Sequence, residues 1–250
     1  MPALADLSRS WLARAPIAHR GLHDLAAGRP ENSLAAFARC CETGFAAELD
    51  VRLSRDGEVV VFHDRAVRRL TGAAGRVEDL TGAQLTALEI HGTGERIPLL
   101  REVLALVAGR VPLLVELKRC ARGPALERAV LRALGGYRGA VAIQSFKRRS
   151  VKHLDRAEAP HAVGHLWRRV HVHGAQVRPA FYGCHVAVAG SAAVRRRRAA
   201  GAIVLAWTVR SPEEARWALR HVDNYIFEGF VPDLVEHRLS ALRSAAAASR

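Results

Sequence analysis

The sequence predicts an α/β fold, a (β/α)8 barrel of the TIM type. Short runs rich in Val, Ile and Leu alternate with helical stretches along the whole chain, and this alternation is typical of α/β proteins. Several runs are apolar without interruption, as expected for strands buried on both faces of a parallel sheet. The chain has 250 residues, and about 250 residues is the usual size of such a barrel.

Nine segments have the composition of strands, one more than a closed barrel needs. The link between the second and third segments is too short for a crossover helix. Either that pair has an irregular connection within the barrel, or one segment lies outside it, and the sequence leaves both readings open. The nine segments are residues 16–20, 46–53, 58–64, 111–118, 140–146, 161–167, 184–190, 202–209 and 224–230.

Six helices are expected between these strands. The first begins at Ser33 and ends at Gly44, residue types that favour a helix N-cap and C′ position. The last begins at Ser211, with Pro212 in its first turn. The six helices are residues 33–44, 81–90, 99–109, 123–136, 192–201 and 211–222.

No linker or internal repeat divides the chain. We therefore expect an N-terminal segment at residues 1–14, a single barrel domain at residues 15–236 and a frayed C-terminal tail at residues 237–250. No apolar run reaches the ~18–20 residues of a membrane span, and charged residues interrupt the N-terminus where a secretory signal would need an apolar run. We expect a cytoplasmic protein without a transmembrane segment. Nothing in the sequence indicates an oligomeric state.

The net charge is +14, and almost all of the basic residues are arginine. The run Arg195–Arg198 favours the solvated face of a helix over a patch that binds phosphate or a membrane surface. Aromatic side chains for base stacking do not accompany it, so no nucleic-acid partner is expected. Peripheral contact with a membrane stays open. The four cysteines lack the spacing of a zinc or disulfide site, and Cys40 and Cys41 are expected to be small buried side chains.

Acidic side chains lie on predicted strands where a core should be apolar. Glu48 and Asp50 share one face of their strand, and Glu116 shares a face with Lys118 on another. Because the carboxyl ends of barrel strands converge at one rim, the three carboxylates would meet there. Their burial is unfavourable without compensation, and a divalent cation supplies it. Oxygen ligands favour Mg²⁺ or Ca²⁺ over zinc.

Basic groups surround the predicted cation site. Arg20 and Lys118 suit an anionic substrate, above all a phosphate. His19 and His63 lie at the ends of two predicted strands. One imidazole can act as a general base that takes a proton, and the other as a general acid that gives one. Each of these side chains, taken alone, is more simply interpreted as an exposed surface residue or as a residue with a structural role. Their joint occurrence at the ends of apolar strands predicts metal-assisted cleavage of a phosphodiester.

Several motifs together resemble the glycerophosphodiester phosphodiesterase family, in their order and spacing. The resemblance extends from about Ile17 to Pro232, and the long E-x-D…H-D stretch followed by E-L-K is its most specific part. The motifs are HRG (19–21), PENS (30–33), ELDVRLSRDGEVVVFHD (48–64), LTGAAGRVEDLTGAQL (70–85), IPLLREVL (97–104), ELK (116–118), QSF (144–146) and WTV (207–209).

The resemblance implies a TIM barrel that hydrolyses small-molecule glycerophosphodiesters, such as glycerophosphocholine, to sn-glycerol 3-phosphate and an alcohol. It implies one Mg²⁺ or Ca²⁺ ion, held by the positions that match the family's ligands. It also implies a general base and a general acid and two phosphate-binding residues. The matching positions are Glu48, Asp50 and Glu116 for the metal, His19 and His63 for catalysis, and Arg20 and Lys118 for the phosphate.

The chain departs from the family pattern in its C-terminal half. Arg210 stands where the family usually has Asn, and Glu228-Gly229 where it usually has Thr-Asp. These changes leave the specificity for the alcohol open. Trp207 fits either a stacking surface for the glycerol or head group or a core aromatic at a strand end. The pair His171 and His173 has metal-like spacing, but without nearby carboxylates we read it as structural.

Two other functions remain as alternatives. A lysophospholipase D-like enzyme would share the scaffold and act on lysolipids; it would need an apolar lip at the rim of the barrel. A non-catalytic basic protein that holds nucleic acid would have little reason to keep the histidines, carboxylates and lysine in register.

Overall fold

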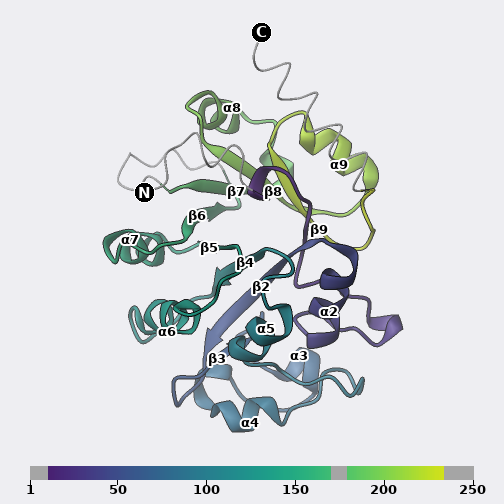
Figure 1. The fold of residues 1–250 in the computed structure, drawn as a ribbon, viewed down its shortest axis with the longest axis vertical. Coiled ribbons are helices and arrows are strands. Elements are labelled where there is room, and N and C mark those ends of the chain that lie inside the picture. The colour runs from purple at the N-terminus through teal and green to yellow at the C-terminus, as the bar shows by residue number, and fades with distance from the viewer. Residues whose placement is uncertain (1–10, 170–178, 234–250) are drawn as a thin grey trace.

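The computed structural model describes residues 11–169 and 179–233. Nine strands form one sheet in the order β1-β9-β8-β7-β6-β5-β4-β2-β3, and the pairing of β1 with β2 closes it into a ring (Figure 1). All pairings within the ring are parallel, whereas β3 pairs antiparallel with β2 outside it. The predicted TIM-type barrel is confirmed, and the extra strand candidate is the one that lies outside.

The barrel strands are β1 (Ile17–Ala18), β2 (Ala46–Leu53), β4 (Leu113–Leu117), β5 (Val141–Ser145), β6 (Ala162–Trp167), β7 (Phe181–His185), β8 (Ile203–Val209) and β9 (Asn224–Phe227). The outer strand is β3 (Val59–Val61). The helices are α2 (Leu34–Thr43), α3 (Arg68–Thr71), α4 (Gly82–Thr86), α5 (Leu100–Val107), α6 (Ala125–Leu134), α7 (Arg148–Arg156), α8 (Ala192–Ala199) and α9 (Pro212–Leu219). The short 3-10 turns are η1 (Trp11–Ala13), η2 (Leu25–Ala27), η3 (Val77–Asp79) and η4 (Val186–Val188). Across the described ranges, no helix combines the length and apolar character needed to cross a membrane.

The predicted strand at 184–190 was misplaced. The structure places β7 at Phe181–His185, and η4 follows it. Gly183 weakens the strand signal at the centre of β7, where a Cβ would lie 2.4 Å from Leu166 Cδ2 and would displace that side chain. His185 ends the strand, since its side chain accepts a hydrogen bond from the backbone of Ala187.

Helices α3 and α7 were not predicted, and the predicted helix at 81–90 is limited to the short α4. Helix α7 is mostly polar, and Ser150, Val151 and Leu154 are its buried side chains, which is too few to produce an apolar periodicity. The cap residues were predicted correctly. Ser33 Oγ accepts a hydrogen bond from Ala36 N at 3.1 Å, and Gly44 closes α2 with a φ of 79°.

Side chains alternate between two environments along the barrel strands. Outward-facing residues of β2 pack against the helices in the largest apolar cluster; they include Ala47, Leu49 and Val51. Inward-facing residues nearer the amino ends of the strands form a separate apolar layer, which includes Ala46, Leu114, Ala142, Phe181, Leu205 and Ile226. Leu12 closes this layer, and Asn224 holds its segment by donating to the carbonyls of Leu12 and Ala15 at 2.8 and 2.6 Å. On β2, β4 and β5 the next inward positions toward the carboxyl ends are the polar Glu48, Glu116 and Gln144, so the site lies above a packed floor.

A third apolar cluster supports the outer strand β3 and the segment that follows it. It buries Phe62, Leu70, Leu85 and Ile90 together with other side chains between residues 60 and 99. Figure 1 shows β3, α3 and α4 gathered at one edge of the barrel. This small core fixes the loop that continues from β3 to His63.

The arginine run of α8 is only partly a solvated face. Arg197 donates to Tyr182 Oη at 2.6 Å and stacks over its ring, and Arg198 bonds to Asp223 at 2.9 Å. Arg196 is exposed. The run therefore fixes α8 on the barrel as well as facing solvent.

Cysteine reactivity tests this packing. Cys40 and Cys184 are buried, and burial raises the pKa of each thiol to about 12. Cys41, against expectation, is only half-buried, as is Cys120. We expect Cys41 and Cys120 to react with a colorimetric thiol reagent in the native protein, and all four cysteines to react in denaturant. Rapid native reaction of Cys40 or Cys184 would contradict the packing of α2 and β7.

Candidate active site

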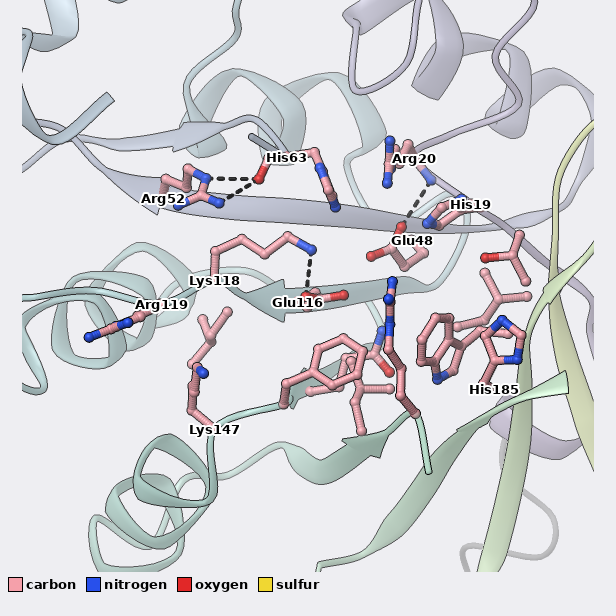
Figure 2. Close-up of a pocket in the computed structure, with 18 of the residues that line it drawn as sticks. His19, Arg20, Glu48, Arg52, His63, Glu116, Lys118, Arg119, Lys147 and His185 are labelled. Atoms are coloured by element: carbon pink, nitrogen blue, oxygen red, sulfur yellow. Dashed lines mark hydrogen bonds and ion pairs between the residues drawn. The ribbon is translucent and has the colours of Figure 1, made fainter. Parts of the chain in front are cut away.

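A single pocket at the carboxyl ends of the strands gathers the residues that the sequence singled out (Figure 2). Its lining comes from strands on all sides of the barrel, so segments far apart in the chain meet there. Asp50 lies beneath this lining and is fully buried. The predicted site residues that line the pocket are His19, Arg20, Glu48, His63, Glu116, Lys118 and Trp207.

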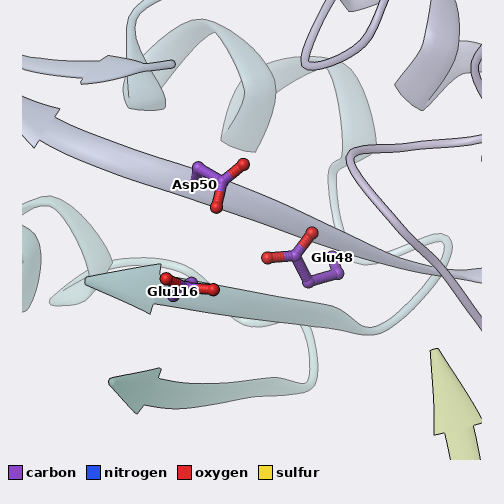
Figure 3. A group of neighbouring side chains, drawn as sticks. All are labelled: Glu48, Asp50 and Glu116. Atoms are coloured by element: carbon purple, nitrogen blue, oxygen red, sulfur yellow. The ribbon is translucent and has the colours of Figure 1, made fainter. Parts of the chain in front are cut away.

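Three buried carboxylates form one cluster at the base of the pocket (Figure 3). One oxygen each of Glu48, Asp50 and Glu116 lies within 4.8 Å of the others. The sheet register explains the cluster: Asp50 and Glu116 are directly paired across β2 and β4, and Glu48 lies two residues earlier on the same face of β2. The strand pairing therefore fixes the cluster.

Two cations compensate part of this negative charge. Lys118 Nζ lies 2.7 Å from Asp50 Oδ1 and 2.6 Å from Glu116 Oε1. Arg20 Nε lies 3.3 Å from Asp50 Oδ2, and the Arg20 backbone N–H donates to Glu48 Oε2 at 2.9 Å. Because Arg20 also pairs with Glu31 at 2.8 Å, its charge is shared, and among the described residues only Lys118 is paired with carboxylates of the cluster alone.

The pKa shifts show which carboxylates the protein compensates. Burial would raise the pKa of Asp50, but Lys118 and other nearby positive groups bring it well below its usual value. Burial raises the pKa of Glu48, and the charges of Asp50 and Glu116 add to the rise. Burial also raises the pKa of Glu116 to about 7, although Lys118 opposes the shift. The protein thus compensates Asp50 and leaves Glu48 and Glu116 short of positive charge.

The cluster suits a hard divalent cation. Glu48 Oε1 is buried and, among the described residues, has no hydrogen-bond partner. A buried oxygen without a partner is unfavourable. Because these residues supply no partner to Glu48 Oε1, a bound cation is the natural one. The three carboxylates offer only oxygen donors, which favour Mg²⁺ or Ca²⁺. Glu48, Asp50 and Glu116 therefore fit the predicted metal.

The loop after β1 is shaped by its sequence to approach the cluster. Arg20 and Gly21 have φ angles of 56° and 78°, and this left-handed turn directs the Arg20 N–H toward Glu48. Glycine is required at position 21, because a Cβ would lie 2.9 Å from Ala36 Cβ. Further along, Asn32 donates to Asp50 Oδ2 at 3.0 Å and accepts from Asp50 N at 3.2 Å.

His63 is held from both its backbone and its ring. Arg52 donates to its carbonyl through Nε and Nη2, at 2.8 and 2.6 Å. Its Nδ1 lies 2.7 Å from Asp64 Oδ1. Burial lowers the pKa of His63, while the charges of Asp50 and Asp64 oppose the shift. The ring therefore favours its neutral form more than a free histidine does.

His19 has a carboxylate at the same ring position. Its Nδ1 lies 2.5 Å from Glu228 Oε2. The hydrogen bond from His19 lowers the pKa of Glu228 to about 2, with a further contribution from Arg210, whose Nη2 lies 2.9 Å from Glu228 Oε1. An ionised carboxylate only accepts hydrogen bonds, so Nδ1 donates and Nε2 is left for the pocket. The bond to Asp64 orients His63 in the same way.

Sequence reasoning did not assign these partners. Asn32 and Asp64 lie inside the PENS and FHD stretches that carried the resemblance, so a signal was available. Glu228 was noted only as a departure, and its bond to His19 depends on β9 lying beside β1 in the closed barrel. His171 and His173 lie outside the described residues.

Trp207 lines the pocket within an aromatic cluster. Its ring centroid lies 5.2 Å from that of Phe146 and 5.1 Å from that of His185, both in edge-on geometry. It is half-buried, which is compatible with a surface that packs against substrate.

Known proteins share this sequence pattern and fold. The chain is 36% identical over 156 residues to a glycerophosphodiester phosphodiesterase of Caldanaerobacter subterraneus, covering 58% of this chain and 63% of that relative. A phosphodiesterase of Oleispira antarctica, solved in complex with the product sn-glycerol-3-phosphate, has a TM-score of 0.79 at 23% identity and covers 93% of this chain and 96% of that one. A Thermotoga maritima glycerophosphodiester phosphodiesterase has a TM-score of 0.70 at 26% identity, with coverages of 93% and 98%. The model of the glycerophosphoryl diester phosphodiesterase family matches residues 19–226, and the chain therefore belongs to that family.

Proposed function

We propose that this protein hydrolyses glycerophosphodiesters to sn-glycerol 3-phosphate and an alcohol. One observation carries the proposal: two imidazoles, each held at Nδ1 by a carboxylate, line the same pocket as a buried carboxylate cluster. Family membership supports the reaction class, and the product bound in the Oleispira antarctica structure supports the substrate class.

The cation in this proposal is one Mg²⁺ or Ca²⁺ ion, held by Glu48, Asp50 and Glu116. When bound, it would polarise a phosphoryl oxygen and stabilise the charge that develops there. Arg20 and Lys118 border the cluster and would orient the phosphate through charge-assisted hydrogen bonds.

His19 and His63 supply the general base and the general acid. One Nε2 takes a proton from the attacking water as the water oxygen bonds to phosphorus. The other gives a proton to the alcohol oxygen as the P–O bond to the alcohol breaks, which leaves glycerol 3-phosphate. Glu228 and Asp64 keep both rings oriented toward the pocket. Trp207 packs against the glycerol or the head group.

One observation favours the lysophospholipase D-like alternative. Among the described residues, the exposed large hydrophobic side chains are Leu25 and Val231, with exposed fractions of 49% and 66%. They lie on the segments that follow β1 and β9, which are neighbours in the barrel. Both segments leave the carboxyl ends of their strands, so this apolar pair belongs to the face that bears the pocket.

The reaction and its metal dependence are tested together. We expect release of glycerol 3-phosphate from glycerophosphocholine and glycerophosphoethanolamine with Mg²⁺ or Ca²⁺. EDTA should abolish turnover and added metal should restore it. Asp50→Asn should lower metal affinity, measured by calorimetry, while circular dichroism shows a folded protein. No turnover of any glycerophosphodiester with either metal would refute the proposal.

The role of Glu228 is tested by a double-mutant cycle. His19→Ala should lower kcat by about 10²–10⁴-fold, the usual contribution of a general acid or base. Glu228→Gln should lower kcat by a smaller factor with little change in KM, and Glu228→Asp should recover part of the loss. Adding Glu228→Gln to His19→Ala should cost nothing more, because Glu228 acts through that ring. Glu213→Gln, which alters an exposed glutamate of α9, is the matched control. Additive losses would contradict the positioning role.

Lysolipid turnover separates the two substrate classes. If the apolar pair engages lipid, lysophosphatidylcholine should be hydrolysed faster than glycerophosphocholine. Leu25→Ser with Val231→Ser should then slow lysolipid turnover selectively. If the wild type prefers glycerophosphocholine and the double variant acts like wild type on both substrates, the lysolipid alternative is wrong.

A further inference from the structure

An arc of positive charge lies at the mouth of the pocket. Arg119, Lys147 and Arg168 line the pocket and are all exposed. They follow β4, β5 and β6, which are consecutive in the barrel, so they occupy one continuous side of the mouth. In the view of Figure 2, Arg119 and Lys147 lie on the opposite side of Glu116 from His19.

The other cations of the pocket all have partners within the protein. Two of them pair with the carboxylate cluster, one with a backbone carbonyl and one with a carboxylate near His19. These cations are Arg20 and Lys118, which pair with Asp50, Arg52, which donates to the carbonyl of His63, and Arg210, which pairs with Glu228. Their charge is therefore already used to fix the site.

The arc differs in having no such pairing. No ion pair found within residues 11–169 and 179–233 includes a side chain of the arc; the Arg168 guanidinium instead lies over the Trp207 ring, 5.8 Å from its centroid. Lys147 is also notable in a chain whose basic residues are almost all arginine. The general excess of arginine in the chain therefore does not explain the positive charge at position 147.

The chemistry of the substrate class says where a second negative charge would lie. The cluster with Arg20 and Lys118 is positioned for the scissile phosphate, and the glycerol is uncharged. A second anionic group can therefore belong only to the alcohol. Resting on the function proposed above, we propose that Arg119, Lys147 and Arg168 bind an anionic group of the leaving alcohol, so that the enzyme favours glycerophosphodiesters with acidic head groups.

A cationic head group fits this side of the mouth poorly. Quaternary ammonium groups are bound by the faces of aromatic rings, and Arg168 already lies over Trp207. The positive charges of the arc also repel choline. Carboxylate and phosphate groups, by contrast, match the donor geometry of arginine.

Glycerophosphoserine and glycerophosphoethanolamine form a matched substrate pair, because they differ by one carboxylate. With metal present, we expect kcat/KM to be about tenfold higher for the serine compound, an effect of the size that a few exposed ion pairs produce. Glycerophosphocholine should be the poorest of the three. Equal kcat/KM values for the serine and ethanolamine compounds would overturn the inference and leave the proposed function intact. No turnover of any of the three would instead overturn the proposed function.

Charge-removing variants assign the preference to the arc. The double variant Arg119→Gln with Lys147→Gln, called the arc variant below, should bring the ratio of kcat/KM for the serine and ethanolamine compounds close to one. Arg168→Gln alone should lower this ratio in part. The matched control is Arg156→Gln with Arg196→Gln, which removes the same charge from exposed positions of α7 and α8 outside the pocket. The control should keep the wild-type ratio. An unchanged ratio in the arc variant would show that the arc does not bind the anionic group of the alcohol.

A bilayer could supply the same anionic chemistry, so a second arm distinguishes the two sources. Binding to phosphatidylglycerol vesicles is measured by co-sedimentation for the wild type, the arc variant and the control. If the arc variant alone loses vesicle binding while the substrate ratio stays as in the wild type, the arc faces a membrane and the inference is wrong. If vesicle binding is equal in all three and the ratio falls in the arc variant, the inference is supported.

Discussion

Three carboxylates that share one face of the neighbouring strands β2 and β4 are the constraint on which the rest of the site depends. Parallel pairing puts Asp50 beside Glu116, and strand alternation adds Glu48 on the same face. Together they place negative charge above an apolar floor, where repulsion is weakly screened. Arg20 and Lys118 lie where they offset part of this charge, and the predicted cation would offset more of it. Substituting any one of them changes the charge around the other two.

Compensation extends beyond the cluster through a chain of ion pairs. Arg20 pairs with Glu31 at 2.8 Å, Glu31 with Arg69 at 2.7 Å, and Arg69 with Asp64 at 2.5 Å. Burial would raise the pKa of Glu31, but Arg69 and Arg20 lower it below its usual value. Because Asp64 also holds the ring of His63, these ion pairs connect Arg20, which borders the carboxylate cluster, to that imidazole. The loops after β1 and β3 therefore form one electrostatic unit.

The parts of the site that follow from local periodicity could be predicted from the sequence. Alternation along a strand placed Glu48 with Asp50, and cap residues fixed the ends of α2. Strand β7 and helix α7 could not be located this way. The central Gly183 interrupts the apolar pattern of β7, and most of the side chains of α7 are polar. The bond of His19 to Glu228 joins residues 209 positions apart. The pairing of β1 with β9 in the closed barrel brings them together.

The position of β9 between β8 and β1 explains why the two departures from the family pattern lie together. Arg210 pairs with one oxygen of Glu228, and His19 bonds to the other. Arg210 therefore adds no free charge to the mouth, although it is exposed. Positive charge on the side of β8, β9 and β1 is neutralised, whereas the side of β4, β5 and β6 keeps its charge. The mouth of the pocket is therefore more positive on the β4–β6 side than on the β8–β1 side. In the proposed complex, a diester whose phosphate lies at the carboxylate cluster would have the lowest electrostatic energy with an anionic alcohol toward β4–β6 and its neutral glycerol toward His19 and Trp207.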